Sequence, residues 1–523
     1  MSAAAGKANP AGLVSLASRN AATAIFARAS ALLVGILLTP FLIRKLGSDL
    51  YGVVVATSSA FEYLLLMRGG IGAAMRRHVT LHVHSGRREE ARAHYAVGFW
   101  LGNAAHLAIL IGAAFLAYPY CRFLGLSEAV SRGAAFGVWL VILAQTVANT
   151  SATLEVPLYA TGRLGGMQIL NALNPWIRLA VLVIAFSLLS PSLSVYGASL
   201  AVAEVPVLLA LGLLAARAGV AGPPFPRPQT GTPQVRRDLL AYGGVALLSQ
   251  ISAILYTTTD NILIGRFFGP SSVTAYSLGA RWEPMIRGFL WAPIVALAPL
   301  FTQLEAHEEE ERSRGAVRRA VRMAAAIAVP CCLVPSILGD LFLVHWVGEE
   351  YRGSAVYLVA MLAPSALTIS LAPVWAALVG RGRIGWIAIG DLVVAVANVA
   401  ISLLLAFVAG LGILGFALGN TIALLLKNLL LIPLAGRREA TIPGLADLLL
   451  PIPKALLGGA PALVLLWFTR PVYGGSMVSI LAALAIGGLL CLAGAALVSM
   501  GPAEIRRFLR KIPRSVGDLD LFG

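Results

Sequence analysis

The stretch TTTDNILIGRFFGPSSVTAYSLGARWEPMIRG, residues 257–288, combines long apolar runs with five charged side chains. Near its centre, Arg266 and Gly269 mark a short polar turn between two apolar segments. The same order occurs in LIRKLGSDLYGVVVATS, residues 42–58, where Arg44 and Gly47 stand in the corresponding places. We therefore predict two copies of one helix–turn–helix unit that run in the same direction, as in transporters built from parallel repeats.

The composition indicates a membrane protein. Of the 523 residues, 58% are hydrophobic and only 12% are charged, whereas soluble chains are about a quarter charged. The net charge of +16 does not indicate nucleic-acid binding, because the chain has no basic domain with interleaved aromatic residues. An excess of Lys and Arg is instead typical of the cytoplasmic loops of membrane proteins.

The chain contains fourteen apolar runs of the length that crosses a bilayer as a helix. They are too long for membrane strands and lack a period-two alternation, so we predict an all-α polytopic membrane protein. The predicted spans are approximately 20–43, 51–75, 95–118, 133–154, 164–188, 193–216, 239–267, 273–301, 318–345, 354–379, 384–408, 411–434, 451–469 and 478–500.

The distribution of basic residues predicts the orientation. With a cytoplasmic N-terminus, most of the 40 Lys and Arg residues fall in the N-terminal segment, the even-numbered connections and the tail after residue 500. The positive-inside rule then places both termini in the cytoplasm. The four cysteines have neither the spacing of a disulfide framework nor that of a metal site.

A Pro- and Gly-rich segment at 218–238 predicts the domain organisation. It separates an N-terminal lobe of six helices, residues 1–217, from a C-terminal lobe of six, residues 239–434. The remainder, 435–523, holds a further helix pair and a basic cytoplasmic tail. The segment 504–514 in this tail is basic and amphipathic, which suits the anionic inner leaflet.

The segments TPFLIRKLGSDLYGVVVATSSAFEYLLLMRGGIGAAMRRHV (39–79) and TTDNILIGRFFGPSSVTAYSLGARW (258–282) carry a family resemblance. They resemble Wzx-type polysaccharide and O-antigen flippases, which belong to the multidrug/oligosaccharidyl-lipid/polysaccharide exporter (MOP) superfamily. The resemblance implies two six-helix lobes in a V, related by a pseudo-twofold axis. It also implies transport of an undecaprenyl-diphosphate-linked oligosaccharide across the bacterial inner membrane by alternating access.

The resemblance carries two further expectations. Polysaccharide polymerase and glycosyltransferases are the expected partners in polysaccharide biosynthesis, beside the membrane lipids. The additional pair at 451–500 matches in place the helices that form a lipid-tail groove in the lipid II flippase. In one position the chain departs from the family: LLMRGGIG (65–72) has Arg68 where many relatives have an acidic residue. A coupling role for that carboxylate is therefore not expected here.

Several ionisable residues fall within the predicted spans, where each costs about 2.5–3.5 kcal/mol if it faces lipid. The basic members suit the oxygens of a diphosphate, so we assign them to substrate binding. The acidic members and one lysine are assigned to a gate or to ion coupling. The substrate-binding set is Arg28, Arg68, Arg178, Arg281 and Arg287, and the gate or ion-coupling set is Glu62, Glu204, Asp260, Glu283 and Lys427; Asp391 is a further acidic residue within a span.

A structural interpretation of these charges stays open. Glu283 and Arg287 are four residues apart, so they share a helix face and can form an ion pair. Asp260 and Arg281 lie at similar predicted depths and can form a second one. His106 and Glu204 fall in the middle of the predicted spans and could each carry a proton, or be satisfied buried polar residues.

No catalytic or metal-binding site is predicted. RRHVTLHVH (76–84) contains His78, His82 and His84, and His94 follows, but we interpret them as part of a solvated cytoplasmic loop. The chain has no nucleotide-binding motif, so we do not expect ATP hydrolysis. No cofactor is predicted, and we expect a proton or ion gradient, or the cargo gradient, to drive transport.

Three other functions compete with the flippase interpretation. A multidrug extruder would favour an apolar or acidic pocket over several arginines. A lipid II flippase shares the architecture and the diphosphate chemistry. A membrane glycosyltransferase or polymerase would need a large outer loop with catalytic residues, and the predicted outer loops are short.

Overall fold

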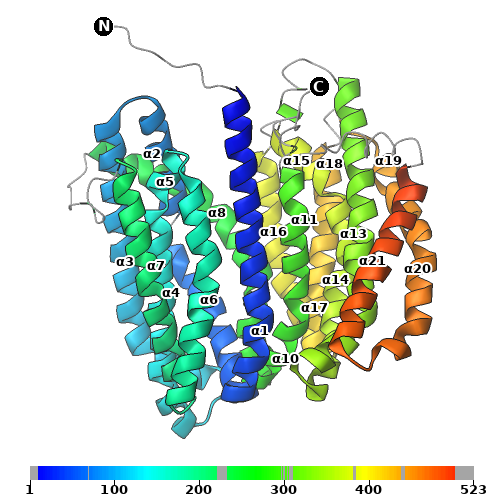
Figure 1. Ribbon diagram of the computed structural model, residues 1–523, viewed down its shortest axis with the longest axis horizontal. Coiled ribbons are helices and arrows are strands. Elements are labelled where there is room, and N and C mark those ends of the chain that lie inside the picture. The colour runs from blue at the N-terminus through cyan, green and yellow to red at the C-terminus, as the bar shows by residue number, and fades with distance from the viewer. Residues whose placement is uncertain are drawn as a thin grey trace. The chain divides into compact units, whose positions relative to one another are not determined.

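The computed structural model describes residues 10–68, 70–220, 226, 233–295, 297, 301–302, 304, 310–380, 384–436 and 442–500. Helices account for the regular structure in these ranges (Figure 1). The first half of the chain contains α1 (Pro10–Leu64), η1 (Leu65–Arg68), α2 (Ile71–His84), α3 (Arg88–Phe123), α4 (Glu128–Leu154), α5 (Val156–Ala160), α6 (Leu164–Leu188), α7 (Leu193–Arg217) and α8 (Pro233–Thr257).

The second half continues with shorter pieces and several long helices. They are α9 (Thr259–Phe268), α10 (Pro270–Ala280), α11 (Trp282–Val295), α13 (Glu310–Val347), η2 (Glu349–Ser354), α14 (Ala355–Ser370), α15 (Ala372–Gly380), α16 (Ile384–Leu403), η3 (Leu404–Val408), α17 (Ile413–Leu426), η4 (Lys427–Leu431), α18 (Ile432–Gly436), α19 (Leu445–Leu449), α20 (Pro451–Tyr473) and α21 (Met477–Met500).

The predicted all-α polytopic architecture is confirmed. Eleven helical stretches of the described residues are long and apolar enough to cross a membrane. The fourteen predicted spans exceed this number in part because α1 contains the first span and most of the second, joined across a bend at Gly47. The seventh and eighth predicted spans are divided between α8 and α9 and between α10 and α11, so neither forms one long apolar helix.

The two turns that suggested a repeat share a backbone conformation. Gly47 has φ 80° and Gly269 has φ 86°, a region that side chains other than glycine rarely adopt. Each glycine changes the direction of the chain between two helical segments, as the sequence pattern predicts. The equivalence of Gly47 and Gly269 therefore extends from sequence to backbone geometry.

Gly52 allows the segments that follow these turns to pack closely. A Cβ atom on Gly52 would lie 1.8 Å from the carbonyl oxygen of Pro270, the first residue of α10. Two backbones can approach this far only if one of them lacks a side chain. The contact joins α1 to the start of the second repeated segment.

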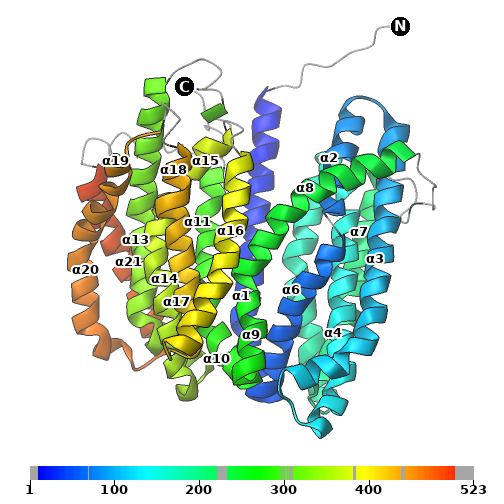
Figure 2. The same ribbon diagram turned by 180° about the vertical axis from the view of Figure 1, so that it is seen from behind.

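Residue contacts divide the described chain into two compact units. The first includes the residues up to Gln250 and Gly265–Pro270, and the second includes Ile251–Ile264 and the residues from Ser271 onward. In the first unit, α4 packs along α7 and α3, and α6 packs along α1 and α7 (Figures 1 and 2). Its core is formed by side chains from α2 to α8, among them Met75, Tyr95 and Met167.

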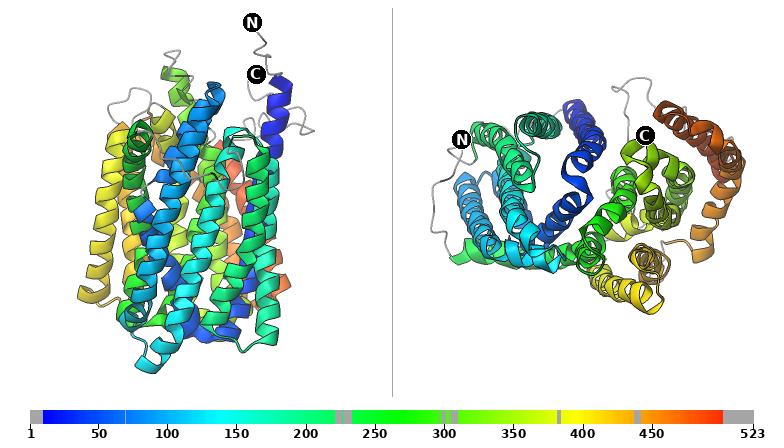
Figure 3. Two further views of the ribbon diagram at one scale, coloured as in Figure 1. Left: turned by 90° about the vertical axis from the view of Figure 1, so that its left-hand side faces the viewer. Right: turned by 90° about the horizontal axis from the view of Figure 1, so that it is seen from below.

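The core of the second unit surrounds α13, which packs against α14, α20 and α21. Figure 3 shows α20 and α21 side by side along the outside of this unit. Gly458 and Gly494 face each other across the pair, so close that a Cβ on either would overlap the backbone of the other. Small residues at helix contacts are typical of membrane proteins, in which association depends on close packing.

Large apolar side chains cover the outer surfaces of the long helices. Phe115 of α3, Leu188 of α6 and Phe468 of α20 are each 77% exposed. A soluble protein would bury such residues, whereas a lipid environment accommodates them. The chain is therefore a multi-pass membrane protein.

We predict that Gly52→Ala destabilises the protein. The added methyl group overlaps the Pro270 carbonyl, and overpacking of this kind costs about 1–3 kcal/mol. The matched control is Gly35→Ala in the same helix, where a Cβ meets nothing within 4 Å. Thermal unfolding in detergent should show a lower Tm for Gly52→Ala and an unchanged or slightly higher Tm for Gly35→Ala. Equal Tm values for the two variants would contradict the close approach.

Candidate functional site

The first unit contains a polar cluster around Arg68, at the end of η1. The guanidinium NH2 donates to Thr153 Oγ1 at 2.5 Å, and NH1 lies 3.5 Å from the carbonyl oxygen of Asn149. Both partners belong to α4. Gly102 on α3 leaves room for the side chain, since a Cβ there would be 3.3 Å from Arg68 Nε. Arg68 is thus held among neutral groups between η1, α3 and α4.

Hydrogen-bonding side chains of α3 and α4 continue this cluster. Thr150 Oγ1 donates to Asn103 Oδ1 at 3.0 Å and lies 3.1 Å from His106 Nδ1. The cluster around Arg68 is therefore formed by Arg68, Asn103, His106, Asn149, Thr150 and Thr153, and is called the Arg68 cluster below.

No ion pair among the described residues includes Arg68, and its Nε is buried without a hydrogen-bond partner. A guanidinium group has five N–H donors, so several of them stay available. A half-buried cation with unused donors, beside amide and hydroxyl groups, has the chemistry to bind an anion with hydroxyl-rich substituents.

A second pair of charges in the first unit is neutralised internally. Arg178 Nε of α6 lies 2.5 Å from Glu204 Oε1 of α7, and Asn174 Nδ2 lies 3.4 Å from Glu204 Oε2. The Glu204 side chain is only 1% exposed. A buried carboxylate needs such a partner, so this pair holds α6 and α7 in register.

The two predicted site residues on α1 lie apart from these groups. Arg28 and Glu62 are both exposed, and neither belongs to the Arg68 cluster. The predicted binding role of Arg28 and the predicted gating role of Glu62 stay predictions.

In the second unit, the structure contains the Glu283–Arg287 ion pair that the spacing predicts. Arg287 NH2 lies 3.1 Å from Glu283 Oε2, and Ser365 Oγ of α14 donates to Glu283 Oε1 at 3.0 Å. Glu283 is 2% exposed. The carboxylate is thereby satisfied by one neighbour on its own helix and one on α14.

Asp260 and Arg281, which the structural interpretation would pair, have other partners among the described residues. Asp260 is buried on α9 and accepts a hydrogen bond from the Tyr276 hydroxyl of α10 at 2.6 Å. Arg281 instead donates from Nε to the carbonyl oxygen of Ser277, and its guanidinium lies 5.8 Å from the ring centroid of Trp346. The hydrogen-bond partner of the Asp260 carboxylate is therefore a tyrosine hydroxyl, whereas the similar predicted depths of Asp260 and Arg281 suggested an arginine.

Lys427, a predicted gate or ion-coupling residue, has an acidic partner. Its Nζ lies 2.8 Å from Asp391 Oδ1, which joins η4 to α16. The lysine also lies 5.7 Å from the Tyr256 ring centroid. Roles in gating or coupling for Lys427, Glu204, Asp260 and Glu283 stay predictions, and the structure adds that all four have local partners.

The histidines are a correction to the sequence interpretation. His78 and His82 lie on α2 and His94 lies on α3, so they are not in a loop, and His82 and His94 are buried. Only His84 matches the expectation of a solvated residue, because it is exposed. The physical reason is that α2 continues well beyond the predicted second span and packs against α3.

The sequence interpretation missed Asn103, Thr150 and Thr153 as members of the Arg68 cluster. A signal was present, since Asn103 and His106 are three residues apart on α3 and Thr150 and Thr153 repeat that spacing on α4. Such spacing puts polar side chains on one face of an otherwise apolar helix.

The family model described as Polysaccharide biosynthesis protein matches residues 222–356. EpsK, an uncharacterized membrane protein of Bacillus subtilis (strain 168), is 23% identical over 404 residues, which cover 76% of this chain and 78% of EpsK. Among solved structures, an inward-facing multidrug resistance MATE family transporter of the MOP superfamily has a TM-score of 0.67 at 14% identity, covering 80% of this chain and 95% of that one.

The lipid II flippase MurJ, in an inward closed conformation, also has a TM-score of 0.67, at 12% identity. The match covers 94% of this chain and 99% of that chain. The chain has the fold of the MOP superfamily. The predicted resemblance to polysaccharide flippases of this superfamily is thereby confirmed. These two solved structures are of a transporter and a flippase, and at 12–14% identity they show the fold alone.

We predict that Arg178→Ala lowers the stability of the protein by about 1–3 kcal/mol, because it leaves a buried carboxylate without its cation. Adding Glu204→Gln should recover part of the loss. The control is Arg132→Ala, which breaks the exposed Arg132–Glu128 pair and should change stability by less than about 1 kcal/mol. Chemical unfolding in detergent measures the free energy of unfolding of the wild type, Arg178→Ala, the double variant and Arg132→Ala. If Arg178→Ala and Arg132→Ala had equal effects, Arg178 would be available for cargo rather than needed for packing.

Proposed function

We propose that this protein is a flippase of the bacterial inner membrane that moves an undecaprenyl-diphosphate-linked oligosaccharide from the cytoplasmic to the periplasmic face. It works by alternating access, with both termini in the cytoplasm. The observation that carries the proposal is the Arg68 cluster. It is a polar site in an apolar protein, and its cation has no carboxylate partner among the described residues.

The chemistry of the cargo fits this cluster. A diphosphate has several negatively charged oxygens, and a guanidinium group binds such oxygens through two parallel hydrogen bonds. Asn103, Asn149 and Thr150 supply amide and hydroxyl groups of the kind that bind sugar hydroxyls. Arg178 and Arg287 are weaker candidates than the sequence indicates, because each already has a buried carboxylate partner.

Other anionic lipids share part of this chemistry. Lipid II also has a polyprenyl diphosphate, and the match to MurJ extends over more of this chain than the match to the MATE transporter. The helix pair α20 and α21, which follows the two predicted six-helix lobes, is consistent with the larger share of this chain that MurJ matches. A cationic drug is a poorer cargo, because the charge of Arg68 would repel it.

The test is a transport assay in proteoliposomes with a fluorescent polyprenyl-diphosphate oligosaccharide. We predict that Arg68→Ala lowers the initial rate roughly 10- to 100-fold, the range expected for lost hydrogen bonds to a charged group. Arg68→Lys should have an intermediate rate, because lysine keeps the charge but not the planar fork. Arg132→Ala, which alters an exposed arginine, should transport at the wild-type rate.

Competing cargo separates the alternatives in the same vesicles. If lipid II is transported in preference to the oligosaccharide lipid, the cargo is lipid II rather than the proposed one. If only a cationic dye is transported, the protein is a multidrug extruder. Wild-type rates in a folded Arg68→Ala protein would remove Arg68 from the cargo site.

A further inference from the structure

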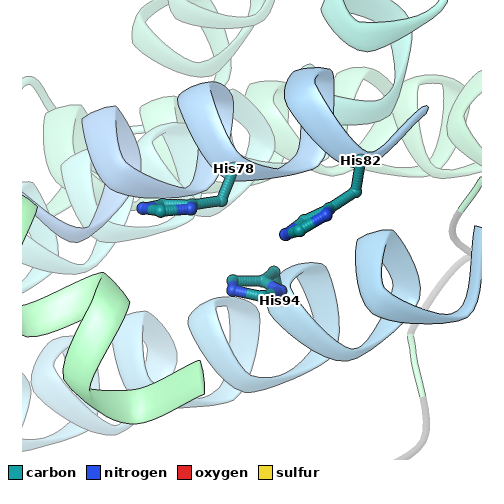
Figure 4. Close-up of side chains that lie close together, drawn as sticks. All are labelled: His78, His82 and His94. Carbon is teal, nitrogen blue, oxygen red and sulfur yellow. The ribbon is translucent and has the colours of Figure 1, made fainter. Parts of the chain in front are cut away.

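The hairpin of α2 and α3 brings three histidines together (Figure 4). His78 and His82 are one turn apart on α2 and point toward His94 of α3. The chain reverses between the helices at Gly86, where φ is 75°. The ring centroids of His82 and His94 are 4.7 Å apart, and those of His78 and His94 are 5.2 Å apart.

Each of these imidazoles has a buried nitrogen without a hydrogen-bond partner. The atoms are Nε2 of His78, Nδ1 of His82 and Nε2 of His94. Burial lowers the pKa of His78 and of His82, and the neighbouring His94 lowers both further. A neutral imidazole with a free lone pair is the form that binds a metal ion.

The positions of the three nitrogens suit one ion. One ligand atom from each histidine lies within 4.8 Å of the other two. Bonds of about 2.1 Å to a tetrahedral zinc ion place ligand nitrogens roughly 3.4 Å apart. Where two of these nitrogens are farther apart than that, binding of the ion requires the imidazoles to rotate about their side-chain bonds.

The surroundings of the histidines resemble an outer coordination shell. His94 Nδ1 lies 2.8 Å from the carbonyl oxygen of Glu90 and donates to it, so Nε2 is the nitrogen that this ring can offer to a metal ion. Asp238 Oδ2 of α8 lies 3.6 Å from His94 Nε2, and its side chain is 29% exposed. A carboxylate at this position can complete a four-ligand site.

A second carboxylate lies at the other side of the cluster. Glu90 Oε2 is 3.1 Å from His82 Nδ1 and also accepts from Arg87 NH1 at 3.2 Å. Because His82 Nδ1 is without a hydrogen-bond partner, this contact lacks hydrogen-bond geometry. The negative charge of Asp238 favours a cation between the rings, and Glu90 adds to this effect in part, because Arg87 already offsets some of its charge.

We propose that His78, His82 and His94 bind a divalent transition-metal ion, with Zn²⁺ the preferred ion and Asp238 the fourth ligand. Three imidazoles and one carboxylate are a typical zinc ligand set. The site is structural, because protein side chains occupy all four positions. It joins α2, α3 and the first turns of α8, and so fixes the start of α8. This inference does not depend on the identity of the transported lipid.

The test measures Zn²⁺ binding to the full-length protein in detergent, purified with a tag that contains no histidine and stripped with a chelator. Titration against a chromophoric chelator should give one saturable site per chain. His94→Gln and His82→Gln should each weaken Zn²⁺ binding at least about tenfold, since even outer-shell changes weaken metal sites by that amount. Asp238→Asn should weaken it less.

His84→Gln is the matched control. His84 is on the same helix and exposed, and its Nδ1 bonds to the carbonyl oxygen of Thr80. It should bind Zn²⁺ as the wild type does. Zn²⁺ should also raise the Tm of the wild type and of His84→Gln but not that of His94→Gln, because a ligand that binds only the folded state stabilises it. The Tm of the metal-free proteins checks that each variant is folded.

A second measurement needs no variant. Replacing Zn²⁺ with Co²⁺ should give the intense visible absorption of a tetrahedral cobalt site in the wild-type protein, and added Zn²⁺ should remove it. The proposal is overturned if the wild type has no saturable Zn²⁺ site, if Co²⁺ gives only an octahedral spectrum, or if folded His94→Gln binds Zn²⁺ as tightly as His84→Gln.

Discussion

The hydrocarbon of the membrane offers no hydrogen bonds, so each polar group within a spanning helix needs a partner inside the protein. This constraint explains why the long helices carry apolar residues on their outer surfaces and why Glu204, Glu283 and Asp260 have partners within hydrogen-bonding distance. It also makes any group without such a partner informative. Arg68 is a cation whose hydrogen-bond partners are neutral groups. Binding of an anion would therefore balance its charge.

The constraint separates structural charges from candidate cargo contacts. Arg178 and Arg287 each neutralise a buried carboxylate, and Lys427 pairs with the half-buried Asp391. Removing any of these charges would leave an acid unpaired, so the loss of stability and the loss of transport would be hard to separate. Arg68 differs because its removal leaves only hydroxyl, amide and carbonyl groups behind. The ion pairs make Arg178, Arg287 and Lys427 weaker candidates for cargo contacts, and Arg68 is the arginine on which the proposed function rests.

The sequence predicted what depends on local spacing. The spans followed from apolar length, the turns at Gly47 and Gly269 from a repeated Arg and Gly, and the Glu283–Arg287 pair from a four-residue interval. Contacts between helices could not be predicted in this way. The Arg178–Glu204 pair depends on the relative register of α6 and α7, and depth alone did not distinguish Arg281 from Tyr276 as the partner of Asp260.

The histidines illustrate the same limit. Their solvated position was inferred from a polar stretch after an apolar run, whereas α2 continues as a helix and α3 begins two turns before His94. Because the chain reverses at Gly86, His78 and His94 stand at equal distances from the turn. An antiparallel helical hairpin through that glycine would have placed these two residues opposite each other, so the signal was present but needed the hairpin to be recognised.

The most direct test of the central claim is the binding of a short polyprenyl diphosphate and of the corresponding monophosphate to purified protein, measured by calorimetry at one salt concentration. The account predicts that the wild type prefers the diphosphate and that Arg68→Ala, still folded, loses this preference. Equal affinity for the two lipids in the wild type, or an unchanged preference in Arg68→Ala, would contradict the assignment of the Arg68 cluster to an anionic head group.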